Sequence, residues 1–167
     1  MNKKVWSVLA LILICSMIFA GCGSEKQEEK QNFSVYSFSG EDENLTVTNG
    51  VIVLSDDYEA FYGGNLQVNE ENFAGATSFE ETFYVLKDGE KEIISSNSLT
   101  DTTGGAVNVG GDLGKKWGAG SISGKFDADD LKNNFFFEFT VTDIEGNTHT
   151  YQTQMKVVEV TEGMNEK

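Results

Sequence analysis

The sequence predicts an all-β domain between residues 33 and 160, an antiparallel β-sandwich of immunoglobulin-like type with about eight or nine short strands. Three observations support this fold class. Short apolar runs alternate with turn-forming residues at intervals of roughly 8 to 12 residues. The chain is rich in phenylalanine, with 12 residues, and in valine, which favours strands over helices. It contains no proline, so its turns must depend on glycine, asparagine and aspartate.

The first strand is expected to begin at Phe33. Apolar residues alternate with serine up to Phe38, but the phase shifts between Val35 and Tyr36, which predicts a bulge or a strand that changes sheets. The next two strands, 45–48 and 51–54, flank the dipeptide Asn49-Gly50. Because Asn-Gly supplies the two positive φ angles of a type I′ turn, these strands are predicted to form a tight hairpin.

The middle of the chain predicts two further strands and a second hairpin. Residues 58–62 and 66–68 are expected to form strands separated by a bend at 63–64, and 69–76 to form a loop. The hairpin is expected to join 79–86 and 91–95 through Asp88-Gly89. Alternation places Glu81 on the same face as Phe79, Phe83 and Val85, with Tyr84 and Leu86 on the other, so both faces are expected to be covered.

The segment 96–124 is rich in glycine and is expected to be a long excursion with one or two short strands. It contains Trp117, preceded by Lys115 and Lys116, and this loop is the predicted binding surface. A strand over 122–126 and a turn or single helical turn over 127–131 should follow.

The last hairpin is expected to be long. On its first strand Phe135, Phe137, Phe139 and Val141 alternate with more polar residues, and residues 143–147 form the turn. The alternating residues expected on the second strand are His149, Tyr151, Thr153, Met155 and Val157. Residues 161–167 are expected to be a polar tail.

The N-terminal segment is predicted to be a targeting signal. Lys3 and Lys4 precede an apolar run over 5–20, which is shorter than the roughly 20 residues that a membrane-spanning helix needs. The run ends in the small residues Ala20 and Gly21, followed by Cys22. Phe19 stands where leucine is commonest in signals of this kind. An ordinary cleaved signal and an uncleaved anchor with an incidental cysteine are the alternative interpretations.

This segment resembles the lipobox signal of bacterial lipoproteins. The resemblance implies that residues 1–21 are a signal peptide, that cleavage falls between Gly21 and Cys22, and that the Cys22 thiol carries diacylglycerol. It also implies a location on the extracytoplasmic face of the cell membrane, with the fatty-acyl chains, palmitate among them, as the membrane contact. Residues 22–32 would then be the lipidated cysteine and a flexible polar tether, because 23–32 contain no hydrophobic residue.

The charge of the chain restricts its partners. The formal net charge is −15, and it becomes −17 once Lys3 and Lys4 leave with the signal peptide. No arginine is present. A body this acidic is repelled by nucleic-acid backbones and by anionic lipid surfaces, so the sequence predicts no nucleic-acid partner and no electrostatic attachment to the membrane. Cations, basic peptides and neutral molecules are the expected ligands.

Three groups of residues are candidates for chemistry. His149, the only histidine, could serve a Ser-His-Asp relay, although a histidine at a hairpin end commonly only hydrogen-bonds. Asp127, Asp129 and Asp130 could bind calcium, although the other ligands of a calcium-binding loop are missing and a solvated acidic surface explains the same residues. No other cofactor is expected. Trp117, with tyrosines such as Tyr58 and Tyr62, could provide stacking platforms for carbohydrate.

No catalytic constellation emerges from these residues. We therefore expect a non-enzymatic, lipid-anchored binding or interaction module at the cell envelope, with an unidentified protein or cell-wall partner. The alternative is an envelope hydrolase that acts on cell-wall glycan through paired carboxylates. Two carboxylates facing each other across a cleft would favour the hydrolase.

Overall fold

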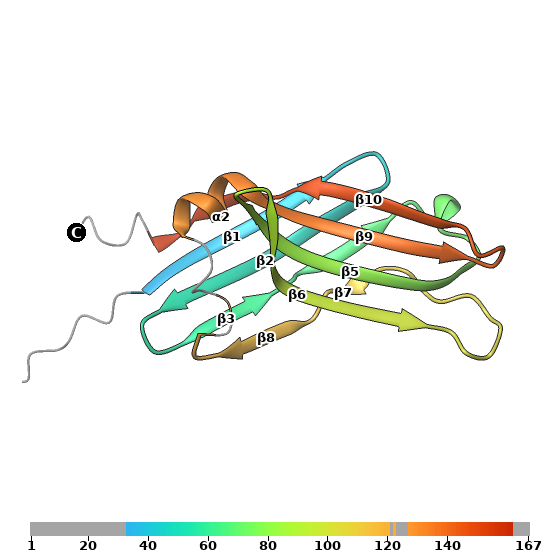
Figure 1. Ribbon diagram of the computed structural model, residues 1–167, viewed down its shortest axis with the longest axis horizontal. Helices are drawn as coiled ribbons and strands as arrows, with labels where there is room; N and C mark the ends of the chain where they lie inside the picture. The colour runs from blue at the N-terminus through green and yellow to red at the C-terminus, as the bar shows by residue number, and fades with distance from the viewer. Residues whose placement is uncertain (1–32, 121, 123–126, 162–167) are drawn as a thin grey trace, which may run out of the picture. The chain divides into compact units, whose positions relative to one another are not determined.

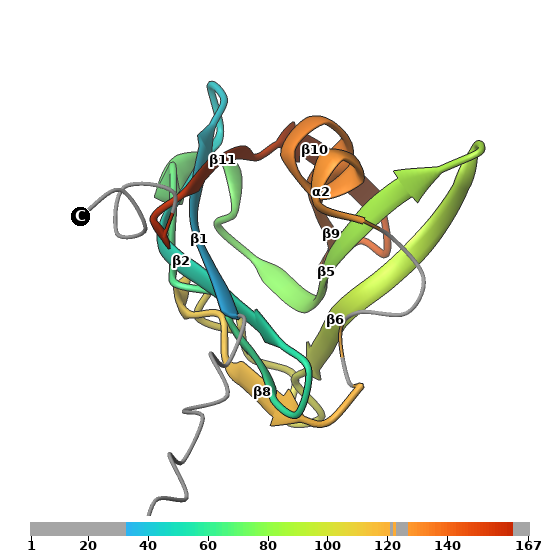
Figure 2. The same ribbon diagram turned by 90° about the vertical axis from the view of Figure 1, so that its left-hand side faces the viewer.

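The computed structural model describes residues 33–120, 122 and 127–161, and these form two antiparallel β-sheets in a sandwich-like arrangement (Figures 1 and 2). The all-β class expected from the sequence is confirmed. The expected strand over 122–126 falls mostly outside the described residues; Ile122 itself is buried.

The larger sheet, sheet A, has the strand order β11-β1-β2-β3-β8. These strands are β1 (Phe33–Glu41), β2 (Leu45–Ser55), β3 (Glu59–Tyr62), β8 (Lys115–Gly118) and β11 (Lys156–Glu159). Two short strands extend it beside β2, namely β4 (Asn65–Val68) and β7 (Gly111–Asp112). The segment 96–124, expected to be a long excursion with one or two short strands, contains β7 and β8, but its first five residues, 96–100, continue the second strand of the Asp88-Gly89 hairpin.

The smaller sheet, sheet B, has the order β10-β9-β5-β6. Its strands are β5 (Ala76–Lys87), β6 (Glu90–Thr100), β9 (Phe135–Asp143) and β10 (Thr148–Gln154). The 3-10 helix η1 (Glu70–Asn72) lies between β4 and β5 in the chain, and α2 (Ala128–Asn134) precedes β9. Figure 2 shows α2 at one end of the sandwich between the sheets, and its Leu131 is fully buried in the core.

The hairpin expected at Asp88-Gly89 is confirmed. Asp88 has φ 52° and Gly89 has φ 85°, and the turn joins β5 to β6. Tyr84 and Val85 are both completely buried although they point to opposite faces, as expected for a strand covered on both sides.

The hairpin predicted at Asn49-Gly50 is wrong. β2 continues through these residues, pairing with β4 over its first half and with β3 over its second half. Between the pairs Gly40↔Val47 and Phe38↔Gly50, β1 has one residue, Ser39, and β2 has two, Thr48 and Asn49, so β2 forms a β-bulge immediately before Gly50. Only Asn49 has positive φ, at 60°, whereas a type I′ turn needs two such residues.

Packing explains why the chain does not turn there. A Cβ atom on Gly50 would lie 2.2 Å from ring atoms of Phe38, so the glycine lets this ring pack directly against the backbone of β2. The irregularity predicted between Val35 and Tyr36 is absent, because both residues lie in regular register with β2. The pairing of β1 with β2 is irregular only at the bulge opposite Ser39. Val35 points outward and Tyr36 inward, so the apolar residues on both faces of β1 gave the impression of a phase shift.

The partner strand of the last hairpin also differs from the prediction. β10 ends at Gln154, and β11 leaves sheet B to pair with β1 in sheet A. Met155 lies at the crossing, with its side chain buried and its backbone N–H donating to the Phe135 carbonyl at 2.8 Å. Gly40 makes room for it, because a Cβ there would lie 2.2 Å from the Met155 methyl carbon.

Glu81 is the buried carboxylate of sheet B, on the core-facing side expected from alternation. Only 8% of its surface is exposed, and the Asn97 Nδ2 donates to its Oε1 at 3.0 Å. Burial raises the pKa of Glu81 above its ordinary value, which outweighs the lowering by Asn97, and the negative charge of Asp112 raises it further.

This raised pKa predicts a pH-dependent effect of Glu81→Gln. The folded protein binds the Glu81 proton more tightly than the unfolded chain does, so stability falls as pH rises from the ordinary glutamate pKa through the raised one. Glutamine keeps an acceptor for Asn97 but carries no charge. We expect the variant to have a higher Tm than the wild type at pH 7 and a shrinking advantage towards pH 4, measured by circular dichroism. An advantage that is constant across this range would contradict the explanation.

Candidate functional site: the outer face of sheet A

The outward side chains of sheet A form a surface that we call the aromatic-lysine face. Alternation defines it, because Tyr36, Ile52 and Phe61 point into the core and their strand neighbours therefore point outward. Its members are Val35, Ser37 and Ser39 on β1, Val51 and Val53 on β2, Ala60 and Tyr62 on β3, Lys115 and Trp117 on β8, and Lys156 and Val158 on β11.

The strand register arranges these side chains in rows across the sheet. One row runs Val35, Val53, Ala60, Trp117. The next crosses all five strands, in the order Val158, Ser37, Val51, Tyr62, Lys115. Ser39 and Lys156 begin a third row. The face thus carries apolar and aromatic groups along its middle and one lysine near each side edge.

The tryptophan hollow lies at the β8 side of this face and has a volume of about 300 Å³. Its outward-facing lining includes Trp117, Tyr62 and the nearby Tyr58, so the three aromatic residues considered for stacking from the sequence meet in one place. Trp117 is 59% exposed, and the Lys115 Nζ lies 5.3 Å from its ring centroid. This cation-π contact holds the lysine over the ring and leaves the rest of the indole open.

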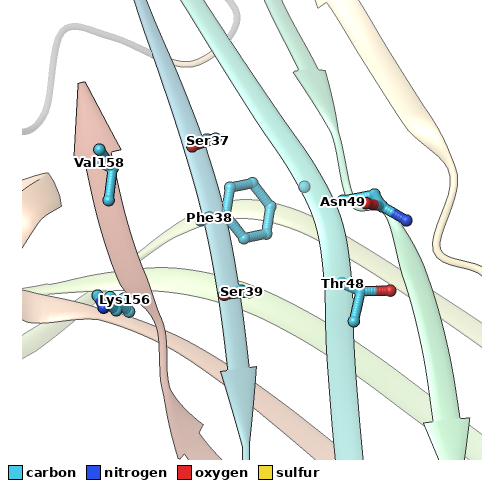
Figure 3. Close-up of a pocket in the computed structure, with 8 residues that line it drawn as sticks. Ser37, Phe38, Ser39, Thr48, Asn49, Lys156 and Val158 are labelled. Atoms are coloured by element: carbon cyan, nitrogen blue, oxygen red, sulfur yellow. The ribbon is translucent and has the colours of Figure 1, made fainter. Parts of the chain in front are cut away.

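The bulge hollow lies at the β11 side of the same face and has a volume of about 440 Å³ (Figure 3). Ser37 and Ser39 lie on β1 at its centre, Thr48 and Asn49 lie on the β2 side, and Lys156 and Val158 on the β11 side. A third hollow of about 420 Å³ continues past Lys156 to Glu41 and Gln154. The bulge hollow is therefore lined mainly by small polar groups, in contrast to the aromatic tryptophan hollow.

The charge of this face differs from that of the whole chain. Neither the tryptophan hollow nor the bulge hollow is lined by a carboxylate, although the chain has 27 acidic residues. Within the part of the chain that the structure describes, Lys115 and Lys156 form no ion pair. Acidic residues occur at the two ends of the strands instead, at 41–43 and at 56–57. The face is a locally cationic area on an acidic protein.

The predicted binding loop is strand β8 in the structure, so Trp117, Lys115 and Lys116 alternate in direction and do not all share this face. Lys116 alternates to the inner side, where its Nζ donates to the Ile94 carbonyl of sheet B at 3.3 Å. It therefore ties the two sheets together at the β8 edge. Lys115 and Trp117, two residues apart, remain together on the outer face.

The structure gives the candidate calcium ligands a different role. Asp127 and Asp130 form a reciprocal capping box at the start of α2, in which the Asp127 side chain accepts from the Asp130 N–H at 2.9 Å. Asp130 also pairs with Lys87 at 3.1 Å, which lowers the pKa of Asp130. Asp129 lies in the first helical turn. Helix capping thus accounts for Asp127 and Asp130, and no cluster of metal-binding side chains occurs within residues 33–120 and 127–161.

His149 is exposed and lines a small hollow of about 100 Å³ with Tyr151, Asp143 and Phe73. No serine lines this hollow. The Asp143 carboxylate is occupied in the β9–β10 turn, where it accepts from the side chain and the backbone N–H of Asn147 and from the Glu145 N–H. These bonds lower the pKa of Asp143. Asp143 therefore stabilises the β9–β10 turn, and the arrangement around His149 does not resemble a Ser-His-Asp triad.

Carboxylate pairs were the other candidate chemistry. Each of the four hollows described above is lined by at most one carboxylate. The two buried glutamates are already hydrogen-bonded: Glu59 accepts from the Ile122 N–H at 2.6 Å, and Glu81 accepts from Asn97. Neither glutamate lines any of these hollows.

Sequence reasoning missed the aliphatic part of the face, Val51 and Val53. The signal was present, because residues 51–54 are apolar at every position and a strand with that pattern has apolar groups on both faces. The predicted Asn49-Gly50 hairpin hid this signal, because in an isolated two-stranded hairpin the outward valines would not lie on the face of a larger sheet.

The predicted lipidation and cleavage residues, Cys22 and Gly21, lie outside the described residues. In the part of the chain that the structure describes, no helix has the length and apolar character needed to span a bilayer. No family model, no curated protein and no solved structure matches this chain.

Proposed function

We propose that this protein is a lipid-anchored lipoprotein of the extracytoplasmic membrane face that acts as a non-catalytic binding module, with the aromatic-lysine face as its binding surface. The observation that carries the proposal is the tryptophan hollow, where Trp117, Tyr58 and Tyr62 meet and no carboxylate lines the surface. Exposed aromatic groups supply large contact area at little cost in side-chain entropy, which suits recognition of a ligand.

The described hollows favour this proposal over a glycan hydrolase. Acid-base cleavage of a glycosidic bond uses two carboxyl groups placed on either side of the bond. The three larger of these hollows are open, lined mainly by hydroxyl, aliphatic and aromatic groups with lysines, and none of the three is lined by a pair of carboxylates. An open sheet face suits the binding of an extended ligand that is not chemically changed.

The proposal includes the immunoglobulin-like type of sandwich as an expectation. In its favour are two facing antiparallel sheets and a chain that passes between them at Met155. The adjacency of β1, β2 and β3 in one sheet is a simple meander, and this part of the topology does not by itself support the immunoglobulin-like type.

The membrane anchor can be tested with Cys22→Ser. Two acyl chains hold a protein stably on a bilayer, whereas the serine variant has no thiol to receive them. We expect wild-type protein in the membrane fraction with a mass increased by the lipid, and no lipid on the variant. Metabolic labelling with radioactive palmitate is the direct measurement. Label retained in the serine variant would contradict lipidation at Cys22.

The binding role can be tested with Trp117→Ala. Protein expressed from the full chain and purified in detergent is mixed with isolated cell-wall material and sedimented. We expect wild-type protein to co-sediment and the variant to lose at least about tenfold in affinity, equivalent to about 1.4 kcal/mol. Because Trp117 is 59% exposed, its removal should leave the melting temperature unchanged.

The matched control is Leu99→Ala, which removes a 49% exposed apolar side chain from sheet B. It should bind as the wild type does. Equal sedimentation of wild type and Trp117→Ala, or no sedimentation of either, would overturn the proposed binding surface.

A further inference from the structure

We infer that the ligand of the aromatic-lysine face is an anionic glycan strand, a chain of sugar rings bearing carboxylate or phosphate groups, which lies across the five strands of sheet A. This inference rests on the proposed function and specifies its ligand class. It depends on the order of side chains across the sheet, on the position of the two lysines and on the position of the acidic loops.

The order of side chains suits sugar rings. From β11 to β8, the row across all five strands presents an aliphatic, a hydroxyl, an aliphatic, an aromatic and a cationic group, in the order Val158, Ser37, Val51, Tyr62, Lys115. Neighbouring strands lie about 4.8 Å apart, so β11 and β8 are separated by about 19 Å, a length that accommodates about four sugar rings. Trp117 and Tyr62 offer ring faces to the C–H surfaces of a sugar, and Ser37, Ser39 and Thr48 offer hydroxyls to its polar edge.

The two lysines specify negative charge at more than one ring. Lys115 lies at the β8 side and Lys156 at the β11 side, and neither is paired with a carboxylate in the described chain. A single small anion cannot reach both, whereas a polymer with repeated charges meets both at once and gains from the second contact. Although the whole chain is acidic, charges beyond about 8 Å are largely screened at physiological ionic strength. The local charge of the face, and not the net charge of the chain, therefore determines whether an anionic ligand is attracted.

The acidic loops favour a narrow strand over a flat anionic surface. Glu41, the last residue of β1, and the β1–β2 loop residues Asp42 and Glu43 lie at one end of the strands, and the β2–β3 loop contributes Asp56 and Asp57 at the other. β2 runs between these loops for 11 residues, or about 36 Å at roughly 3.3 Å per residue. A ligand that crosses the strands near Val51 avoids both loops, whereas a bilayer laid on the face would approach them and be repelled.

The test measures binding of defined probes to the purified full-length protein by isothermal titration calorimetry. The probes are the hexamer of galacturonic acid, its monomer, and the neutral hexamer cellohexaose. We expect the charged hexamer to bind at least about tenfold more tightly than either of the others, and its affinity to fall as salt is raised.

Two double variants separate local charge from net charge. Lys115→Gln with Lys156→Gln should weaken binding of the charged hexamer roughly tenfold and leave cellohexaose unchanged. Lys87→Gln with Lys91→Gln removes the same charge from sheet B and should stay within about twofold of the wild type. Equal losses in both double variants would overturn the inference.

Other outcomes also decide the matter. Tighter binding of cellohexaose than of the charged hexamer would overturn the anionic character of the ligand while leaving the binding module intact. Preference for a thymidine 20-mer or for water-soluble dihexanoyl phosphatidylglycerol, lost in the Lys115/Lys156 variant, would assign the face to nucleic acid or lipid and overturn the glycan. Failure of all probes while cell-wall material still sediments the protein overturns this inference alone; failure of cell-wall sedimentation overturns the proposed function.

Discussion

Replacing Phe83 with alanine should lower the free energy of unfolding by about 3 to 5 kcal/mol, the largest effect expected of any single truncation in this protein. Phe83 is 2% exposed, and its ring contacts four other phenylalanine rings. Two of them, Phe38 and Phe61, belong to sheet A, and the others, Phe135 and Phe137, belong to sheet B. Truncation would therefore open a cavity where the two sheets meet.

Urea denaturation followed by circular dichroism measures this loss. The total stability of a domain is about 5 to 15 kcal/mol, so the variant should unfold at a much lower urea concentration with an unchanged slope. Phe33→Ala is the control, because Phe33 is 52% exposed at the start of β1 and its loss should cost no more than about 0.5 kcal/mol. A loss below about 1 kcal/mol for Phe83→Ala would contradict the central position of this ring.

Much of the fold follows from short-range sequence patterns. Asp88-Gly89 predicted its hairpin because both residues adopt the positive φ that the turn requires. The alternation of Phe135, Phe137 and Phe139 predicted the buried face of β9, and all three are completely buried. These features depend on neighbours in sequence, so local chemistry is sufficient to specify them.

The parts that could not be predicted depend on distant partners. Asn49-Gly50 has the local chemistry of a turn, but Phe38 packs against Gly50 and two further strands, β3 and β4, pair with β2 on either side of it. Likewise, nothing local marks Gln154 as the end of β10. β11 leaves sheet B because β1 offers it an edge to pair with, and Gly40 offers space for Met155. Tertiary packing decides both cases.

The candidate site shows the same division. Trp117 could be identified from sequence as an unusual exposed aromatic residue, and alternation separates Lys115 from Lys116. The position of Trp117 beside Tyr58 and Tyr62 could not be predicted, because it requires β8 to pair with β3 across more than fifty residues of intervening chain. Acidic residues were harder to interpret, because the same carboxylate can bind an ion, cap α2 as Asp127 does, or clasp a turn as Asp143 does.

Replacing Gly50 with alanine should destabilise the protein by about 1 to 3 kcal/mol, the cost of overpacking a filled interior. The new Cβ would lie 2.2 Å from the Cε2 and Cζ atoms of Phe38, closer than any van der Waals contact allows, so either the ring or the backbone of β2 must move. The backbone of Gly50 does not have positive φ, so conformational strain does not contribute to the loss. Thermal and urea unfolding of the purified variant measure it.

A double-mutant cycle with Phe38→Ala tests this cause directly. If the ring is what opposes a side chain at position 50, Gly50→Ala should cost much less once the ring is gone, giving a coupling energy of about 1 kcal/mol or more between the two positions. An equal cost in both backgrounds would mean that glycine is needed at the bulge for another reason. The cycle also bears on the binding surface, because Asn49 and Gly50 line the bulge hollow and any shift of β2 there would move Thr48 and Val51. Gly50→Ala should therefore weaken binding of cell-wall material as well as folding, whereas Phe83→Ala, measured below its own unfolding transition, should affect stability far more than binding.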